Sequence, residues 1–250
     1  MRLIRNLRNA VAFLTVLPVG MDRDGLYQAA KYMPVFPLIG ALTGFVCGSF
    51  VWALELYLPT LIAGVLGLGF LLLFTGVHHT DGLLDFGDAV MAHGSREERL
   101  RVMRDGQTGA GGFSLGFIAL ATTAVGIAAI NQGTVVQALI ASEASAKFAM
   151  VFQAAMGKPA HRGMSTPFVK AMHERYRCSR FGLAFGLQLV ISVAMLQIVG
   201  VVLTVSAVAV AAAMLAISMR TLGGVTGDVM GATNDLTRLV SFLVIVVGAR

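Results

Sequence analysis

Long apolar runs alternate with polar stretches along the whole chain. Seven of these runs are at or near the roughly 20 residues that a helix needs to cross a bilayer. The runs lie at 33–58, 61–77, 110–131, 134–156, 181–199, 200–219 and 238–249. Only the last is short. The pattern predicts an all-α fold, a polytopic integral membrane bundle of about seven transmembrane helices in a single domain, 1–250.

The first 20 residues have a different pattern. A helix here would place three arginines on one side and larger apolar side chains on the other. The two sets are Arg2, Arg5 and Arg8, and Leu3, Leu7, Val11 and Leu14. A signal peptide is the alternative, but no small-x-small cleavage site comes before Asp22. We therefore expect an uncleaved interfacial helix.

The connectors between the apolar runs fall into two groups. Those at 59–60, 132–133 and around Gly200 are very short and uncharged. The long, polar ones are 1–32, 78–109, 157–180 and 220–237. Because short and long connectors alternate, all the long ones fall on one side, and they carry most of the arginines and lysines. The positive-inside rule predicts that this side, with the amino terminus, is cytoplasmic in a cell membrane.

Composition narrows the possible partners. Hydrophobic residues make up 56% of the chain and charged residues 13%, and the mean hydropathy is +0.78. The net charge of +6 fits topology and anionic lipid headgroups, because no basic patch is interleaved with aromatic residues. We expect membrane lipid as a partner and no nucleic acid. Self-association into a homo-oligomer is left open.

The connector 78–109 holds six of the thirteen acidic residues. Asp81, Asp85 and Asp88 are spaced so that a helix would project them from one face, where like charges repel. A divalent cation bound by carboxylate oxygens would relieve this repulsion, and oxygen ligands suit Mg²⁺, with Mn²⁺ possible. The alternative is a solvated acidic helix face. His79, beside these residues, is read as a polar partner to the carboxylates.

Other polar stretches carry complementary groups. Arg104 and Asp105 precede a glycine-rich helix entry that includes Gly109, whose backbone N–H groups could bind phosphate. The basic stretch 157–180 favours either lipid headgroups or an anionic substrate. Asp228 lies among glycines in 223–235. A carboxylate pole and a basic pole on one side of a membrane together indicate metal-assisted phosphoryl transfer.

Three separated motifs resemble the cobalamin synthases, the adenosylcobinamide-GDP ribazoletransferases. They are the block from His79 to Asp88, the Met103-Arg104-Asp105 segment with Gly109, and the block Gly223-Gly224-Val225-Thr226-Gly227-Asp228 with Gly231-Ala232. Phe13-Leu14-Thr15 and Phe36-Pro37-Leu38-Ile39-Gly40 support the match. The resemblance covers most of the chain in the same order.

The resemblance implies a Mg²⁺-dependent enzyme of vitamin B12 nucleotide-loop assembly. A ribose hydroxyl of α-ribazole, or of its 5′-phosphate, would attack adenosylcobinamide-GDP and release GMP. Carried over by position, the metal ligands are Asp81, Asp85, Asp88 and Asp228. The base would be Asp88 or Asp105. The groups holding substrate would be Arg104, His79, Gly109, Lys158 and Arg162.

The chain departs from this family pattern at two places. Gly106-Gln107 stands where serine and arginine are usual, and Arg238 stands where the last motif often carries a glutamate. If that glutamate is a ligand, its role must pass to Asp235 or be absent. Separately, Glu143 and Lys147 are four apart within one run, and we expect them to pair as structural residues.

Two rival functions share some of these features. A CDP-alcohol phosphotransferase also uses aspartates, a metal and a departing nucleoside monophosphate. Its Asp-Gly motif continues with Ala-Arg, whereas Asp81-Gly82 is followed by Leu83-Leu84-Asp85. A cation transporter would place its acidic residues near the membrane midplane in broken helices, whereas these aspartates fall at the ends of apolar runs.

Overall fold

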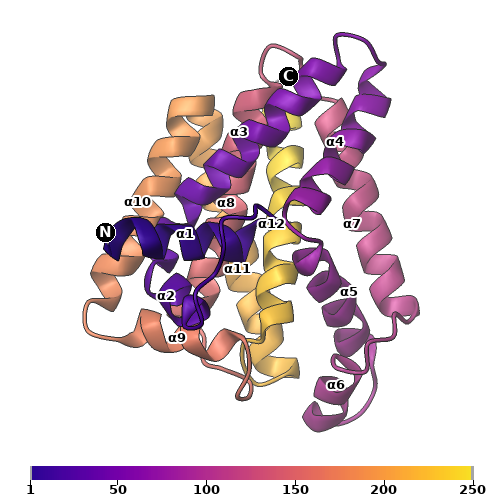
Figure 1. Cartoon of the computed structure of the whole chain (residues 1–250). Helices are drawn as coiled ribbons and strands as arrows, with labels where there is room; N and C mark the ends of the chain where they lie inside the picture. Colours follow the sequence, from indigo (N-terminus) through magenta and orange to yellow (C-terminus); the bar gives the residue numbers. More distant parts are fainter. Residues whose placement is uncertain (1, 249–250) are drawn as a thin grey trace.

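The computed structural model describes residues 2–248, with the side chains of residues 5–248 (Figure 1). The helices are α1 (Arg2–Leu14), α2 (Gly25–Lys31), η1 (Met33–Val35), α3 (Phe36–Leu54), α4 (Thr60–Phe74), α5 (His78–Met91), α6 (Arg96–Val102), α7 (Ala110–Ala128), α8 (Val135–Met156), α9 (Ser165–His173), α10 (Arg177–Leu196), α11 (Ile198–Thr221) and α12 (Gly227–Gly248). No strand forms in this range, and the pairing of Pro159 with Val225 is an isolated bridge. The predicted all-α fold is confirmed.

Six helices are long and apolar enough to cross a membrane alone: α3 with η1, α7, α8, α10, α11 and α12. Helices α4 and α5 pass this test only together, and they meet at a bend of 96°. Helix α4 is the apolar member and matches the predicted run 61–77. Helix α5 carries the aspartates and lies beside α6 at one end of the bundle (Figure 1). We treat α5 as lying outside the spanning segments.

The predicted start of the short run 238–249 was wrong. Helix α12 begins at Gly227 and has 22 residues, so Asp228 and Asp235 belong to the helix and not to a loop. The polar residues at its start lowered the apparent hydropathy of the segment. Buried partners, described below, allow Asp235 and Arg238 to lie inside a bundle.

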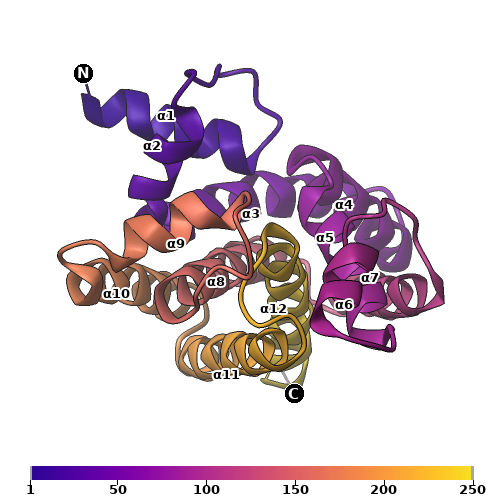
Figure 2. The same ribbon diagram turned by 90° about the horizontal axis from the view of Figure 1, so that it is seen from below.

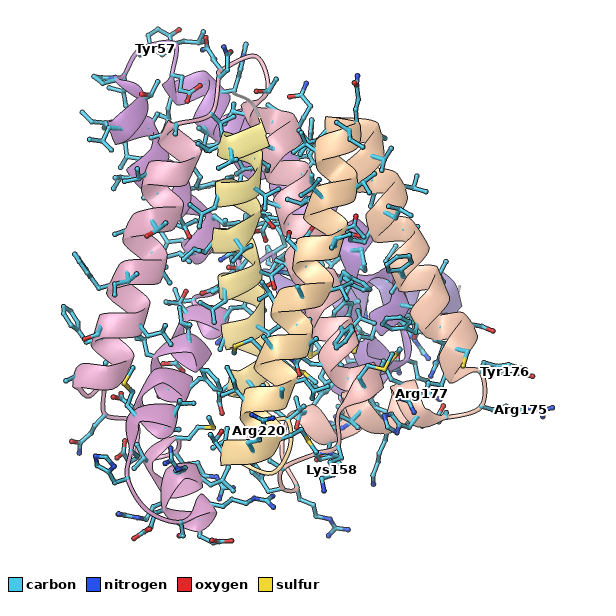
Figure 3. The ribbon with its side chains drawn as sticks, turned by 180° about the vertical axis from the view of Figure 1, so that it is seen from behind. Tyr57, Lys158, Arg175, Tyr176, Arg177 and Arg220 are labelled. Carbon is cyan, nitrogen blue, oxygen red and sulfur yellow. The ribbon has the colours of Figure 1, made fainter. Side chains whose placement is uncertain are left out.

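The polar connectors around α6, between α8 and α9 and between α11 and α12 meet at one end of the molecule, as predicted, whereas α1 of the stretch 1–32 lies near mid-height (Figure 1). Lys158, Arg175, Arg177 and Arg220 lie toward that end, and Tyr57 lies at the opposite one (Figure 3). Helix α12 ends at Gly248, where a Cβ atom would lie 2.9 Å from the side chain of Val199 at the start of α11. We call the end with Lys158 and Arg220 the polar-loop end.

Helix α8 is the most enclosed helix, and it packs closely against α3 through glycines. A Cβ atom placed on Gly40 would lie 2.3 Å from the backbone oxygen of Glu143, and one on Gly44 would lie 2.2 Å from that of Leu139. These distances exclude any side chain. Small residues therefore allow the two helices to pack closely at this interface.

Helix α1 forms where the amphipathic segment was predicted. Ala10 and Leu14 are buried, whereas Arg8 points to the polar side and donates a 2.6 Å hydrogen bond to Asp22. Asn9, which is fully buried, donates to the same carboxylate at 3.0 Å. These bonds tie α1 to the segment leading into α2.

The turn between α4 and α5 sets the direction of the aspartate-bearing helix. Gly76 and Val77 both have positive φ, of 75° and 63°. The conformation is easy for glycine but strained for a β-branched residue. The turn leads into α5. Further along the chain, α6 begins with a capping box, in which Ser95 and Glu98 each accept a hydrogen bond from the other's backbone N–H group.

Candidate functional site

Helices α5 and α12 cross with almost no space between their backbones. A Cβ atom on Gly82 would lie 2.8 Å from the Cα of Asp228, and one on Gly231 would lie 2.9 Å from the backbone oxygen of His79. Seen from the polar-loop end, α12 is near the centre with α5 on one side and α8 on the other (Figure 2). The two glycines therefore bring the first and last aspartate motifs together.

A cavity of about 560 Å³ opens beside this crossing. Its polar edge consists of His78, His79, Asp81, His161, Thr226 and Asp228. Its remaining wall is mainly aromatic residues and methionines from α1, η1, α3, α8, α9 and α12. Of the sequence-predicted residues, Asp81, Asp228 and His79 line this cavity.

Asp85 lies one turn after Asp81 on α5 and is half-buried. Burial raises the pKa of its carboxyl group to about 6, and the negative charges of Asp81, Asp228, Asp88 and Asp105 add to the shift. No Lys or Arg side chain among residues 5–248 forms an ion pair with Asp81, Asp85 or Asp228. The fold thus gathers carboxylates and leaves their charge uncompensated.

Asp88 faces a different neighbour. Its two carboxylate oxygens accept hydrogen bonds from the backbone N–H groups of Gly109, at 2.7 Å, and Gly112, at 2.8 Å. The glycine-rich entry to α7 was expected to offer free N–H groups to phosphate. In the structure Asp88 takes two of these groups and so caps the positive end of α7.

The other predicted residues do not line the cavity. Arg104 and Asp105 are exposed in the connector before α7, and Asp105 accepts a 2.9 Å bond from the backbone of Gln107. Lys158 and Arg162 are exposed on the α8–α9 connector. The backbone of Lys158 accepts a 2.8 Å bond from Val225, which holds this connector against the start of α12.

A buried cluster of charges lies further inside the bundle. Arg238 donates to Asp235 at 2.6 Å and to Glu143 at 3.2 Å, and Lys147 lies 3.4 Å from Glu143. The predicted Glu143–Lys147 pair is confirmed. Arg238 also binds Glu143, and each of the four side chains is at most 3% exposed. We call Glu143, Lys147, Asp235 and Arg238 the ion cluster.

Asp235 therefore does not join Asp228 at the cavity. It is committed to Arg238 and to Thr80 of α5, whose hydroxyl donates to it at 2.8 Å. The sequence held a signal for this arrangement that our reading missed. Asp235 and Arg238 are three apart, and a charged residue within an apolar helix needs a partner.

Sequence reasoning also missed several residues that line the cavity. His161 lines it from the α8–α9 connector, and Phe13 and Phe36 contribute to its apolar wall. Both phenylalanines lie in segments that carried the family resemblance, but no role followed from their pattern. Their meeting depends on how α1 packs against α3.

The carboxylates at the cavity edge fit a Mg²⁺ ion that is shared with a substrate. Among the described residues, no three His, Cys, Asp or Glu side chains converge tightly enough to hold a metal ion by themselves. Mg²⁺ in phosphoryl-transfer sites is commonly held by one or two carboxylates, with substrate phosphates and water filling the other positions. Asp81 and Asp228 at the cavity edge fit that arrangement.

Comparisons with known proteins agree on one family. The family model described as cobalamin-5-phosphate synthase matches residues 6–246. A Methanocella arvoryzae protein named adenosylcobinamide-GDP ribazoletransferase is 35% identical, over 96% of this chain and 94% of its own length. Proteins with the same name from Methanococcoides burtonii and Escherichia coli K12 are each 32% identical, covering 96% and 93% of this chain and 91% and 96% of their own lengths. No solved structure matches the chain.

Proposed function

We propose a function from the premise that this chain belongs to the cobalamin-5-phosphate synthase family. The protein is an adenosylcobinamide-GDP ribazoletransferase. It transfers the adenosylcobinamide-phosphate part of adenosylcobinamide-GDP to α-ribazole, or to α-ribazole 5′-phosphate. The attacking ribose oxygen forms a bond to the cobinamide-side phosphorus, the bond from that phosphorus to the GMP oxygen breaks, and GMP leaves.

The observation that carries this proposal is the meeting of Asp81 and Asp228 at the edge of the cavity. These residues come from motifs almost 150 positions apart, and both are free of ion pairs with Lys or Arg in the described part of the chain. Uncompensated carboxylates beside a cavity favour a cationic ligand. Phosphoryl transfer needs such a ligand to neutralise the phosphate oxygens.

Mg²⁺ is the proposed cofactor, with Mn²⁺ as a possible substitute. Asp81 and Asp228 would hold the ion, and Asp85 would add a third carboxylate from the turn below. When bound, the ion supplies charge neutralisation at the diphosphate. Asp88 is less suited to this role, because both of its oxygens already accept backbone hydrogen bonds.

If Asp81 and Asp228 alone hold the ion, Asp85 is instead a suitable acceptor for the proton of the attacking hydroxyl. Without a metal ion its pKa is about 6, which makes it more basic than an ordinary aspartate and favours general-base catalysis. Asp88 and Asp105 remain the alternatives proposed from the sequence. Arg104, Lys158 and Arg162, all exposed at the polar-loop end, would bind the guanosine-side phosphate.

The reaction is tested by incubating purified protein in detergent with adenosylcobinamide-GDP, α-ribazole and Mg²⁺. We expect GMP release that depends on both substrates, stops with EDTA and returns when Mg²⁺ is added in excess. Folded protein that releases no GMP under these conditions would exclude the proposed function. Release of CMP from a CDP-alcohol lipid would instead indicate the rival phosphotransferase.

The polar-loop end is proposed to face the cytosol of a cell membrane, because its connectors carry the basic residues. The two cysteines provide a test, since Cys178 is exposed and Cys47 is buried. A membrane-impermeant maleimide should label Cys178 only after cells are permeabilised. A Tyr57→Cys variant, whose site is 86% exposed at the opposite end, should be labelled in intact cells. Labelling of Cys178 in intact cells would reverse the topology.

A further inference from the structure

We propose that the cavity is the binding site of the acceptor nucleoside, with its flat aromatic base in the apolar part and its ribose at the edge formed by Asp81 and Asp228. The corrinoid substrate then stays outside the cavity and presents only its diphosphate to this edge. The inference rests on the proposed function, and it assigns the two substrates to different parts of the site.

The size of the cavity fits the smaller substrate. Sites for small molecules usually have volumes of roughly 300–1,000 Å³, and this one has about 560 Å³. A nucleoside with a two-ring base can enter a space of this kind. A corrin macrocycle with its amide side chains and an attached guanosine diphosphate is several times larger.

The apolar wall suits a flat, uncharged ring. Phe13, Phe36 and Phe168 pack together with ring centroids 4.9–6.3 Å apart, and Phe36 and Phe168 are at most 2% exposed. Such rings offer offset-stacked or edge contacts to another aromatic ring. Met33 and Met150 also line the wall, and thioethers make favourable contacts with aromatic rings.

The charges around the cavity argue against a phosphate inside it. No Lys or Arg is among the residues that line it, whereas two carboxylates stand at its edge. A diphosphate would therefore find no cation in the cavity itself. The exposed basic residues Arg104, Lys158 and Arg162 lie outside the lining, where the diphosphate of the larger substrate can reach them.

One buried polar atom points to a ligand. His79 lines the cavity, and its Nδ1 is buried with no hydrogen-bond partner among the described residues. Buried polar atoms in folded proteins normally have a partner. A ring nitrogen of the base, directly or through a water, or a ribose hydroxyl would satisfy this one.

The test measures the two substrates separately in full-length protein. Ala12 lines the cavity, so Ala12→Phe places a ring inside it. We expect KM for α-ribazole to rise at least tenfold, while KM for adenosylcobinamide-GDP changes less than twofold. His79→Phe, which keeps a ring but removes both nitrogens, should change the same KM in the same direction. Leu42→Phe is the matched control, because Leu42 is 54% exposed on α3 and lies outside the cavity.

Calorimetric titration of α-ribazole without the second substrate gives a measurement that is independent of turnover. Binding by the wild type and by Leu42→Phe, with at least tenfold weaker binding by Ala12→Phe and His79→Phe, supports the assignment even if no GMP is released. Equal binding by all four proteins overturns it. A rise confined to KM for adenosylcobinamide-GDP would also overturn it, because the cavity would then belong to the corrinoid substrate. Monodisperse gel filtration checks that each variant is folded.

Discussion

Helices α5 and α12 carry two groups of acidic residues that the fold treats in opposite ways. Asp235 is buried in the ion cluster and bonded to Arg238 and Thr80. Asp228, two turns earlier on α12, lines the cavity beside Asp81 and has no Lys or Arg partner in the described part of the chain. The same pair of helices thus holds one neutralised set and one uncompensated set.

The difference separates structural from functional charge. The ion cluster contains two acidic and two basic side chains within hydrogen-bond or ion-pair distance. The protein itself therefore supplies the counter-ions of these charges. Asp81 and Asp228 at the cavity edge and Asp85 one turn further on α5 carry like charges, and their repulsion adds to the burial that raises the pKa of Asp85. A fold keeps such repulsion only where a ligand compensates it. The comparison predicts which substitutions will affect turnover and which will affect folding.

The largest effect is expected at the cavity edge. Asp81→Asn or Asp228→Asn removes a charge that would bind Mg²⁺, and we expect kcat to fall by about a thousandfold, or about 4 kcal/mol in the activation barrier. The unfolding temperature should not fall. GMP release and thermal unfolding in detergent measure the two effects. Asp24→Asn, an exposed position before α2, is the control, and normal turnover by Asp81→Asn would remove the metal assignment.

The ion cluster should respond in the opposite way. Arg238→Met leaves Lys147 as the only cation of the ion cluster, and breaking a buried ion pair costs about 3–5 kcal/mol. We expect a large loss in the free energy of unfolding. The double variant Arg238→Met with Glu143→Gln should recover part of this loss. Arg220→Met, at an exposed position on α11, serves as the comparison, and an unchanged unfolding midpoint in Arg238→Met would show that the cluster is not stabilising.

Gly82 lies at the crossing that places the two groups of acids. Gly82→Ala would put a methyl group 2.8 Å from the Cα of Asp228 and force α5 away from α12, at a cost of about 1–3 kcal/mol. We expect lower stability and lower kcat together. Gly69→Ala is the matched control, because a Cβ there meets no atom within 4 Å, so this change should raise helix stability by up to about 1 kcal/mol. Equal effects of the two changes would argue against a tight crossing.

Of these substitutions, Asp85→Asn should change the free energy of unfolding least, and its effect should depend on pH. The pKa of Asp85 is raised from 3.8 to about 6, so between these values the folded protein holds a proton that the unfolded chain has lost. Its contribution to stability therefore falls as pH rises through this window. Asp85→Asn should stabilise the fold at pH 7.5 by about 1 kcal/mol, after allowing for solvent screening, and have no effect near pH 4.

The same substitution should nearly abolish GMP release, because an amide neither binds Mg²⁺ strongly nor accepts the proton. For the wild type, turnover should fall in acid at a pH below the value of about 6 that holds for Asp85 without a metal ion, because a bound cation favours the ionised carboxylate. Thermal unfolding and GMP release measured from pH 4 to pH 8 test both statements. A lower stability of Asp85→Asn at pH 7.5 would mean that this carboxylate has a partner after all.

The apolar pattern predicted most of the fold, because each spanning helix needs a long run of apolar residues. It failed at α12, where charged residues are compatible with burial only because α8 supplies their partners. Neither the Arg238–Glu143 contact nor the Thr80–Asp235 bond can be read from spacing along one helix. Such contacts depend on which helices become neighbours.

The carboxylates of the site could be predicted from the sequence, but their neighbours could not. The spacing of Asp81 and Asp85 and the isolated Asp228 indicated a carboxylate site before their positions were known. The hydrogen bonds of Asp88 were not predictable, because they require the start of α7 to lie beside the end of α5. The apolar wall of the cavity was also missed, since α1, α3 and α9 each contribute only one phenylalanine to the Phe13–Phe36–Phe168 group.

The ion cluster has a consequence for how the chain enters the bilayer during synthesis. Glu143 and Lys147 both lie on α8, four residues apart, and Asp235 and Arg238 both lie on α12, three apart. Each helix therefore brings its own counter-ion for its deepest charged residue. Helix α8 can be inserted before α12 has been translated without leaving an isolated charge in lipid. The cross-helix contacts between Arg238 and Glu143 form later, when the two inserted helices pack together.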